Sequence, residues 1–305
     1  MRPSPSQNKL CHIKQAVLLI ALGVTVMHCT KEHLLEAFPS YVTINDIKLT
    51  TNQSTQGSAS ANISEIWLFV DNAFLGGYST SATIPILESG QVNIRFEAGI
   101  RDNGVSATPE LYPFYAPVTV RPTLEPKQID SFNLTFRYRE NTQFALLENY
   151  ENGVTVFQDL IAGSSFNRLR PSTEAAFEGR EGGLIELNTD FPTVELASIR
   201  RFSALQERAV PVYLEVDYQS EAPVQFGVIG FAAGSEVPVD ARYVAGFNPS
   251  PEWKKIYFNL SQAMAESQGE EFKLILQTSL PTENDGTYTR NTAKVRIDNL
   301  KLLHF

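Results

Sequence analysis

Short segments in which apolar and polar residues alternate recur along most of this chain of 305 residues. Such alternation places apolar side chains on one face of a β-strand and polar side chains on the other. Clear examples are Tyr41–Thr50, Val212–Tyr218 and Lys294–Leu303. Gly, Pro, Asn and Ser separate these segments at the spacing typical of β-sandwiches. The pattern predicts an all-β protein that is long enough for two domains.

The strand pattern divides at a polar link, Arg139–Thr142. We therefore expect two tandem β-sandwiches, one over residues 41–139 and one over 140–305. In the first, strands are predicted over residues 41–50, 64–71, 82–87, 91–98, 115–120 and 131–138. A turn at Asp71–Asn72 and an exposed loop over 51–61 are also expected. One short helix is predicted over Ser261–Ser267, with Ser261 as its N-cap.

The first 29 residues have the three parts of an export signal. Arg2, Lys9 and Lys14 form a basic start, and the apolar run Ala16–Met27 follows. As a helix this run would cover about 18 Å, which is too short for a hydrocarbon core of about 30 Å. A cleaved signal peptide over residues 1–28 is therefore favoured over a membrane-spanning helix.

The end of this segment, Val26-Met27-His28-Cys29, resembles the lipobox of bacterial lipoproteins, although His28 stands where that family prefers a small residue. The resemblance implies lipidation of Cys29, a tether over residues 29–40 and an outer-membrane location, with a signal of the looser Bacteroidetes type. The alternative is an incidental Cys beside an ordinary signal peptide. Because Cys11 would be removed, a disulfide framework is excluded and burial alone must stabilise the domains.

Two resemblances cover the rest of the chain. Trp67–Tyr78, followed by Ala82–Leu87 and Val92–Phe96, resembles the transthyretin-like or PEGA-like modules of cell-envelope proteins. Glu252–Ser261 and the closing Lys294–Leu303 resemble two strands of galactose-binding-like jelly rolls, the class that includes carbohydrate-binding modules. The second resemblance implies that residues 144–305 form a jelly roll, but fold alone assigns no ligand.

Composition excludes several function classes. The formal charge of −9 becomes more negative when residues 1–28 are removed, so the chain would repel a phosphate backbone and nucleic acid is not an expected partner. Of four His, His12 and His28 leave with the signal, and only His33 and His304 remain. Catalytic sets that need an imidazole base, and zinc sites, therefore lack their residues. We expect that the protein is not an enzyme.

Paired carboxylates are the one catalytic chemistry that the composition permits. The candidates are Glu148, Glu151, Glu178, Glu181, Glu186, Glu215 and Asp217. Glu186, Glu215 and Asp217 alternate with apolar neighbours, which we interpret as the solvent face of a sheet. A glycoside hydrolase is therefore the least favoured function.

The jelly-roll resemblance also implies a structural calcium where the first and last strands meet. The matching residues are Glu148 or Glu151 and Asp298, whose oxygen atoms suit Ca²⁺. The alternative is that Asp298-Asn299 forms a bulge or accepts backbone hydrogen bonds. No other cofactor is expected.

Aromatic residues are the candidates for ligand contact, because sugar rings pack on aromatic faces. Tyr243, Phe247 and Tyr288 stand in the polar segments 231–251 and 279–292, which we expect to be long loops. They either contact a ligand or fold back on their own sandwich. Trp67 and Trp253 stand in strand patterns and are expected in the cores, and the cluster Tyr112–Tyr115 is a candidate for the interface between the domains.

These observations favour a non-catalytic envelope lipoprotein that binds a glycan or another envelope protein. The alternative is a structural or accessory subunit of an outer-membrane assembly.

Overall fold

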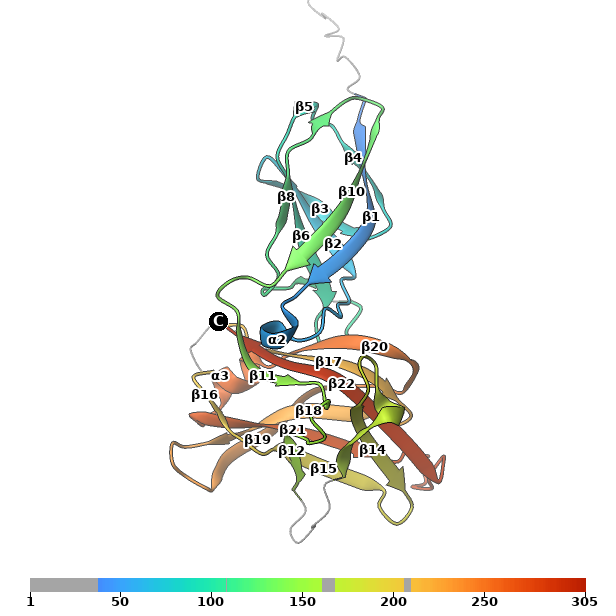
Figure 1. Cartoon of the computed structure of the whole chain (residues 1–305), viewed down its shortest axis with the longest axis vertical. Helices are drawn as coiled ribbons and strands as arrows, with labels where there is room; N and C mark the ends of the chain where they lie inside the picture. Colours follow the sequence, from blue (N-terminus) through green and yellow to red (C-terminus); the bar gives the residue numbers. More distant parts are fainter. Residues whose placement is uncertain (1–37, 108, 161–167, 206–209) are drawn as a thin grey trace, which may run out of the picture.

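The structure is a computed structural model that describes residues 38–107, 109–160, 168–205 and 210–305. It consists almost entirely of β-strands, arranged as two β-sandwiches stacked along the long axis of the molecule (Figure 1). The all-β, two-sandwich prediction is confirmed. Among the described residues, no helix has the length and apolar content needed to cross a membrane.

The N-terminal sandwich has two main sheets. The first has the order β10-β1-β4 and contains β1 (Ser40–Thr50), β4 (Thr83–Ile86) and β10 (Ile129–Arg137). The second has the order β3-β2-β6-β7, with β8 also on β6, and contains β2 (Glu65–Val70), β3 (Ala73–Ser79), β6 (Ile94–Arg101), β7 (Pro109–Leu111) and β8 (Val118–Val120). A small ribbon joins β5 (Gly90–Gln91) to β9 (Thr123–Leu124).

Alternation fixes which face of each strand is buried. In β2, Ile66, Leu68 and Val70 enter the core, while the residues between them face outward. Asp71 and Asn72 both have positive φ angles, 47° and 71°, and form the predicted tight turn into β3. The sequence did not predict β3, because Gly76-Gly77 interrupts its alternation.

The C-terminal sandwich is a jelly roll, as predicted. One sheet has the order β13-β14-β22-β17-β20, with β11 also on β22, and contains β11 (Gln143–Glu148), β13 (Leu169–Ser172), β14 (Gly182–Asn188), β17 (Tyr213–Ser220), β20 (Ser250–Asn259) and β22 (Thr292–His304). The other has the order β12-β15-β21-β18-β19, with β16 on β21, and contains β12 (Phe157–Asp159), β15 (Thr193–Ser198), β16 (Phe202–Ser203), β18 (Val224–Phe231), β19 (Pro238–Phe247) and β21 (Glu271–Ser279).

The helical segments are short. The predicted helix is present as α3 (Ser261–Glu266), but its N-cap is Leu260, not Ser261. The Ser261 hydroxyl oxygen instead accepts a hydrogen bond from the Val212 backbone, 3.0 Å away, which ties the helix to β17. A second helix, α2 (Gln53–Gln56), lies in the segment that we expected to be a loop, and the Asn52 side chain caps it. A 3₁₀ turn, η1 (Thr173–Ala175), precedes β14.

The N-terminal sandwich covers the outer face of the sheet formed by β20, β17 and β22 (Figure 1). In β17, Leu214 and Val216 point into the jelly-roll core, whereas Glu215 and Asp217 point toward the N-terminal sandwich. The interpretation of Glu215 and Asp217 as solvent-facing is therefore wrong. Both are at most 1% exposed, because a second domain covers the face that the alternation marked as polar. Glu186 in β14 is exposed, as expected.

Candidate ligand-binding site at the junction of the two sandwiches

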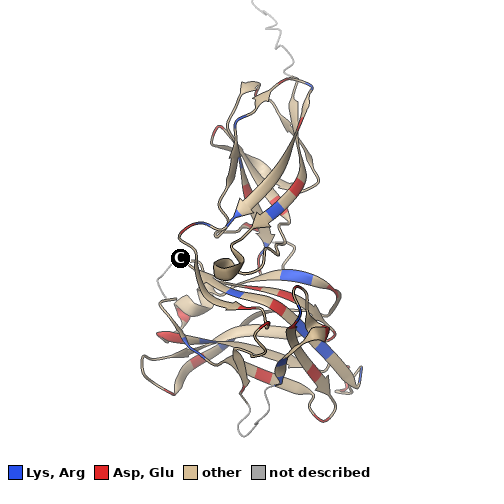
Figure 2. Ribbon diagram, in the orientation of Figure 1, with Lys and Arg blue, Asp and Glu red and all other residues tan. Residues whose placement is uncertain are grey.

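A buried network of charges and hydroxyls joins the two sandwiches. Glu215 accepts hydrogen bonds from the hydroxyls of Tyr112 and Tyr138, at 2.7 and 2.8 Å, and its other oxygen lies 3.1 Å from the Lys255 ammonium. The expected interface role of the Tyr112–Tyr115 cluster is confirmed, since Tyr112 also packs edge-on against Tyr213. Figure 2 shows both acidic and basic positions on the strands beneath the N-terminal sandwich.

A second lysine completes the network. The Lys301 ammonium donates to the Ser58 carbonyl at 2.6 Å and to the Tyr138 hydroxyl at 3.0 Å. Lys301, like Glu215, is at most 1% exposed. Lys255 thus pairs with both carboxylates, Glu215 and Asp217, and the charge of Lys301 also acts on Glu215, so each partner offsets the cost of burying the other.

Burial and neighbouring charges set the protonation of this network. Burial tends to raise the pKa of Glu215, but Lys255, Lys301 and the two tyrosine hydroxyls lower that pKa below its usual value. Burial lowers the pKa of Lys301 to about 8, although Glu215 opposes this shift. Burial opposes charge on Lys255, yet Asp217 and Glu215 raise its pKa above the usual value. Glu215 and Lys255 therefore form a buried ion pair at neutral pH.

A pocket of about 280 Å³ opens at the margin of this junction, where the cover of the N-terminal sandwich ends. The jelly roll contributes two aromatic rings, Phe177 and Trp253, whose centres are 5.2 Å apart. Both are accessible, since Phe177 is 39% exposed and Trp253 is half-buried. Trp253 was expected in a core. It lies on the same face of β20 as Lys255, but just beyond the covered part of the sheet.

Both sandwiches supply the polar residues of this pocket. Ser60 and Asn62 come from the N-terminal sandwich, and Lys254 and the buried Asp217 come from the jelly roll. The Ser60 hydroxyl donates to Asp217 at 2.7 Å, and the Asn62 side chain donates to the Lys255 carbonyl at 3.0 Å. We call this set, with Phe177 and Trp253, the junction pocket. Its geometry depends on how the two sandwiches are joined.

Asp298-Asn299 holds both sides of the junction pocket in place. One Asp298 oxygen accepts hydrogen bonds from the backbone of Phe177 and Glu178, at 3.0 and 3.2 Å. The Asn299 amide donates to Asp217 at 3.1 Å. Asn299 has a positive φ of 49°, and the pairing of β17 with β22 shifts register here, so the bulge alternative is confirmed. Burial raises the pKa of Asp298 to about 7, although its backbone donors oppose the shift.

The carboxylates proposed for calcium each have backbone partners. Glu148 accepts from the Tyr150 backbone at 2.7 Å, and Glu151 accepts from Arg180 and Glu181, at 2.6 and 2.8 Å. Within the described ranges, no group of three or more His, Cys, Asp and Glu residues could hold a metal ion. Glu148, Glu151 and Asp298 thus do not form such a group, and calcium held by Glu148 or Glu151 with Asp298 and loop carbonyls stays a prediction.

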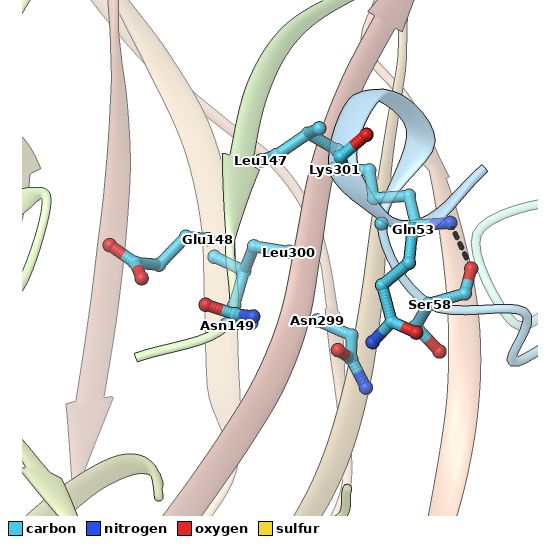
Figure 3. A pocket seen from close by; sticks show the side chains of 10 residues that line it. Gln53, Ser58, Leu147, Glu148, Asn149, Asn299, Leu300 and Lys301 are labelled. Atoms are coloured by element: carbon cyan, nitrogen blue, oxygen red, sulfur yellow. Dashed lines mark hydrogen bonds between the residues drawn. The ribbon is translucent and has the colours of Figure 1, made fainter. Parts of the chain in front are cut away.

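Glu148 instead lines a small polar pocket of about 180 Å³ between the sandwiches (Figure 3). Residues of α2 and the segment after it form one wall, and the end of β11 and the middle of β22 form the other. Figure 3 shows the Lys301 ammonium reaching the Ser58 carbonyl across this pocket, while the Glu148 carboxylate points to the other side. This pocket lacks an aromatic ring and is part of the interdomain contact.

The predicted contact aromatics are only partly brought together. Tyr243 and Phe247 line one pocket of about 290 Å³, but Tyr288 lies elsewhere, between β21 and β22. Tyr243 and Phe247 belong to strand β19, so the expectation of a loop is wrong for them. Phe247 is 5% exposed and stacks on Tyr218 with ring centres 3.8 Å apart, so it is a core residue. Tyr243 and Tyr288 are accessible.

A third aromatic surface lies on the N-terminal sandwich. Trp67, expected in the core, instead lies on the outer face of β2, with Phe74 5.3 Å away between ring centres. The indole nitrogen lies over Gly77 and Gly99, where an added Cβ would stand 3.4 and 3.2 Å from it. Phe74 also contacts Phe69 and is 54% exposed. We call Trp67, Phe69 and Phe74 the N-terminal aromatic face.

The position of the junction pocket was not predictable from the sequence. Alternation placed Asp217 on an outward face and Trp253 was expected in a core, so the pattern gave no sign of which part of the sheet the other sandwich would cover. The sequence did contain one sign of the pocket. The closing pattern Ile297–Leu300 drew attention to Asp298 and Asn299, the two residues that hold its walls in place.

Comparisons with known proteins give structural likenesses only. No protein-family model matches the sequence, and no curated protein matches it. A carbohydrate-binding module of the β-sandwich superfamily is 11% identical, with 79% of this chain and 85% of that chain covered and a TM-score of 0.34. The adhesin domain of Lys-gingipain from Porphyromonas gingivalis is 12% identical, with 53% and 99% covered and a TM-score of 0.34. A family 11 carbohydrate-binding module of a Clostridium thermocellum cellulase is 14% identical, with 53% and 95% covered and a TM-score of 0.34.

Proposed function

We propose that this protein is a non-catalytic binding module of the bacterial outer membrane, and that it binds a glycan in the junction pocket. The observation that carries the proposal is the pair of accessible rings, Trp253 and Phe177, beside polar side chains from both sandwiches. Apolar faces of a sugar ring pack on aromatic rings, while its hydroxyls need hydrogen-bonding partners. The junction pocket offers both within one cavity.

The burial of Glu215 supports binding over catalysis by this carboxylate. Glu215 is fully buried, and its oxygens are occupied by Tyr112, Tyr138 and Lys255. A general acid or a nucleophile must reach the substrate. Glu215 can do neither without separation of the two sandwiches.

An array of neutral and acidic oligosaccharides, probed with the processed chain, tests this proposal. We expect a group of related glycans to bind, and Trp253→Ala to abolish that signal. Tyr288→Ala is the matched control, because Tyr288 is also an accessible aromatic, 42% exposed, but lies outside the pocket. No binding by the unaltered chain, or equal binding by Trp253→Ala, would overturn the proposal.

We also propose that lipid on Cys29 anchors the chain. Cys29 lies outside the described residues, and the support is its place after a basic start and an apolar run. Cys29→Ala is expected to move the protein from the membrane fraction to the soluble fraction. A protein that stays membrane-bound after this change would contradict the anchor.

A second candidate function is docking to another envelope protein. The N-terminal aromatic face favours it, because Phe74 is 54% exposed at the edge strand β3. Co-purification from membranes tests this candidate. It predicts a stable partner that is lost with Phe74→Ser and retained with Trp253→Ala.

A further inference from the structure

The described chain begins at the end of the N-terminal sandwich that lies farthest from the jelly roll (Figure 1). Three large apolar side chains are exposed there: Phe38 at 49%, Leu87 at 67% and Ile129 at 62%. They belong to neighbouring segments, because Ser40 pairs with Ile86 and Tyr41 pairs with Ile129. We call Phe38, Leu87 and Ile129 the apolar tip.

The charges around the apolar tip restrict what can cover it. The Lys127 ammonium lies over the Phe38 ring, 3.7 Å from its centre. Two acidic residues, Glu88 and Asp130, directly follow Leu87 and Ile129 in the sequence. With two acidic groups and one basic group nearby, the tip fits a surface without net charge better than a strongly anionic one.

The number of residues between Cys29 and the apolar tip limits how far the tip can lie from a membrane that holds Cys29. Nine residues lead from Cys29 to Phe38, and fully extended they span at most about 30 Å. A lipid on Cys29 would therefore hold the apolar tip close to the bilayer, where its effective concentration at the surface is high. Weak apolar insertion adds to an existing lipid anchor.

We infer that the apolar tip inserts into the polar–apolar interface of the bilayer that holds Cys29, with uncharged headgroups as its preferred surface. The insertion points the long axis of the molecule away from the membrane and carries the junction pocket outward. This inference rests on the proposed lipid anchor. It concerns a surface that neither the junction pocket nor the N-terminal aromatic face uses.

A depth measurement tests the inference without depending on natural lipidation. The chain from Cys29 onward holds a single thiol, so Cys29 can be coupled directly to a maleimide-bearing lipid in phosphatidylcholine vesicles. A tryptophan is introduced by Leu87→Trp, and brominated acyl chains serve as the quencher. Val237→Trp is the matched control, since Val237 is 71% exposed but lies in the jelly roll. Trp67 and Trp253 contribute the same background to both variants.

We expect brominated lipid to quench the added fluorescence of Leu87→Trp at least twofold more than that of Val237→Trp. Adding Phe38→Ser and Ile129→Ser should reduce the quenching. Equal quenching of Leu87→Trp and Val237→Trp would overturn the inference. Protection of Leu87→Trp from brominated lipid that sets in as coupling density rises, with Val237→Trp unchanged, would also overturn it, because the tip would then be covered by a second copy and not by acyl chains. Failure of natural lipidation would show separately, in the Cys29→Ala fractionation.

Discussion

The role of a residue on the outer face of β20 depends on whether the N-terminal sandwich covers it. Trp253, Lys255 and Tyr257 share one face of β20, yet Lys255 and Tyr257 are buried and Trp253 remains accessible. The same side-chain direction thus yields a buried ion pair at one position and a ligand-contact candidate two residues away. Residue type and alternation alone do not distinguish these outcomes.

Loss of the Glu215 charge should destabilise the molecule strongly. Glu215→Gln leaves Lys255 and Lys301 buried with less compensating charge, so we expect a loss of about 3–5 kcal/mol in the free energy of unfolding. Glu186→Gln, on an exposed carboxylate, is the control and should cost below about 1 kcal/mol. Urea unfolding measures both. A similar stability for the two variants would show that the network contributes little.

Asp298 should make stability depend on pH. Its folded-state pKa of about 7 lies above the ordinary value of 3.8, so the folded chain binds more protons than the unfolded chain between these limits. The stabilising contribution is present below pH 4 and is lost as the pH rises through 7, by at most about 4 kcal/mol. Asp298→Asn should flatten the unfolding free energy over this window. An unchanged slope would contradict the assignment.

At the scale of elements, strands with strict alternation were predictable and the others were not. The predicted segment 41–50 is present as β1, whereas β3 and β19 were missed because glycines or a polar composition interrupt their pattern. Helix α2 was missed since four polar residues carry no apolar periodicity. The jelly roll itself was predictable from its closing strand, because β22 is long and almost continuously apolar on its core side.

Because β14 approaches η1 closely at Gly182, a larger residue at this position should destabilise the fold. Gly182 begins β14, where an added Cβ would overlap the backbone carbonyl of Ala175 at the end of η1. Gly182→Ala is expected to lower the free energy of unfolding by about 1–3 kcal/mol. Gly77→Ala is the control, since a Cβ there would lie 3.4 Å from Trp67, an ordinary contact. Thermal denaturation that ranks Gly77→Ala as the more harmful change would refute this packing.

At the scale of the whole molecule, the two sandwiches behave as one body because polar and aromatic contacts fill their junction. Tyr213, Tyr257 and Leu303 of the jelly roll belong to the core cluster of the N-terminal sandwich. These contacts join residues that are far apart in the sequence, such as Tyr112 with Glu215. No local pattern encodes such pairings. The sequence therefore predicted two sandwiches and Tyr112–Tyr115 as a candidate for their interface, but neither the partners of that cluster nor the pocket beside it.

A shared core predicts cooperative unfolding. Differential scanning calorimetry of the processed chain should show one transition, with a calorimetric enthalpy equal to the van 't Hoff enthalpy. Two resolved transitions would mean that the sandwiches unfold independently and that the junction is weaker than its burial indicates.

Calorimetric titration shows whether both sandwiches contribute to one glycan site. The oligosaccharide that binds best on the array is titrated into the unaltered chain, Trp253→Ala, Asn62→Ala and Tyr288→Ala. We expect at least a tenfold loss of affinity for Trp253→Ala, a measurable loss for Asn62→Ala from the other sandwich, and none for Tyr288→Ala. Unchanged affinity in both Trp253→Ala and Asn62→Ala would contradict it.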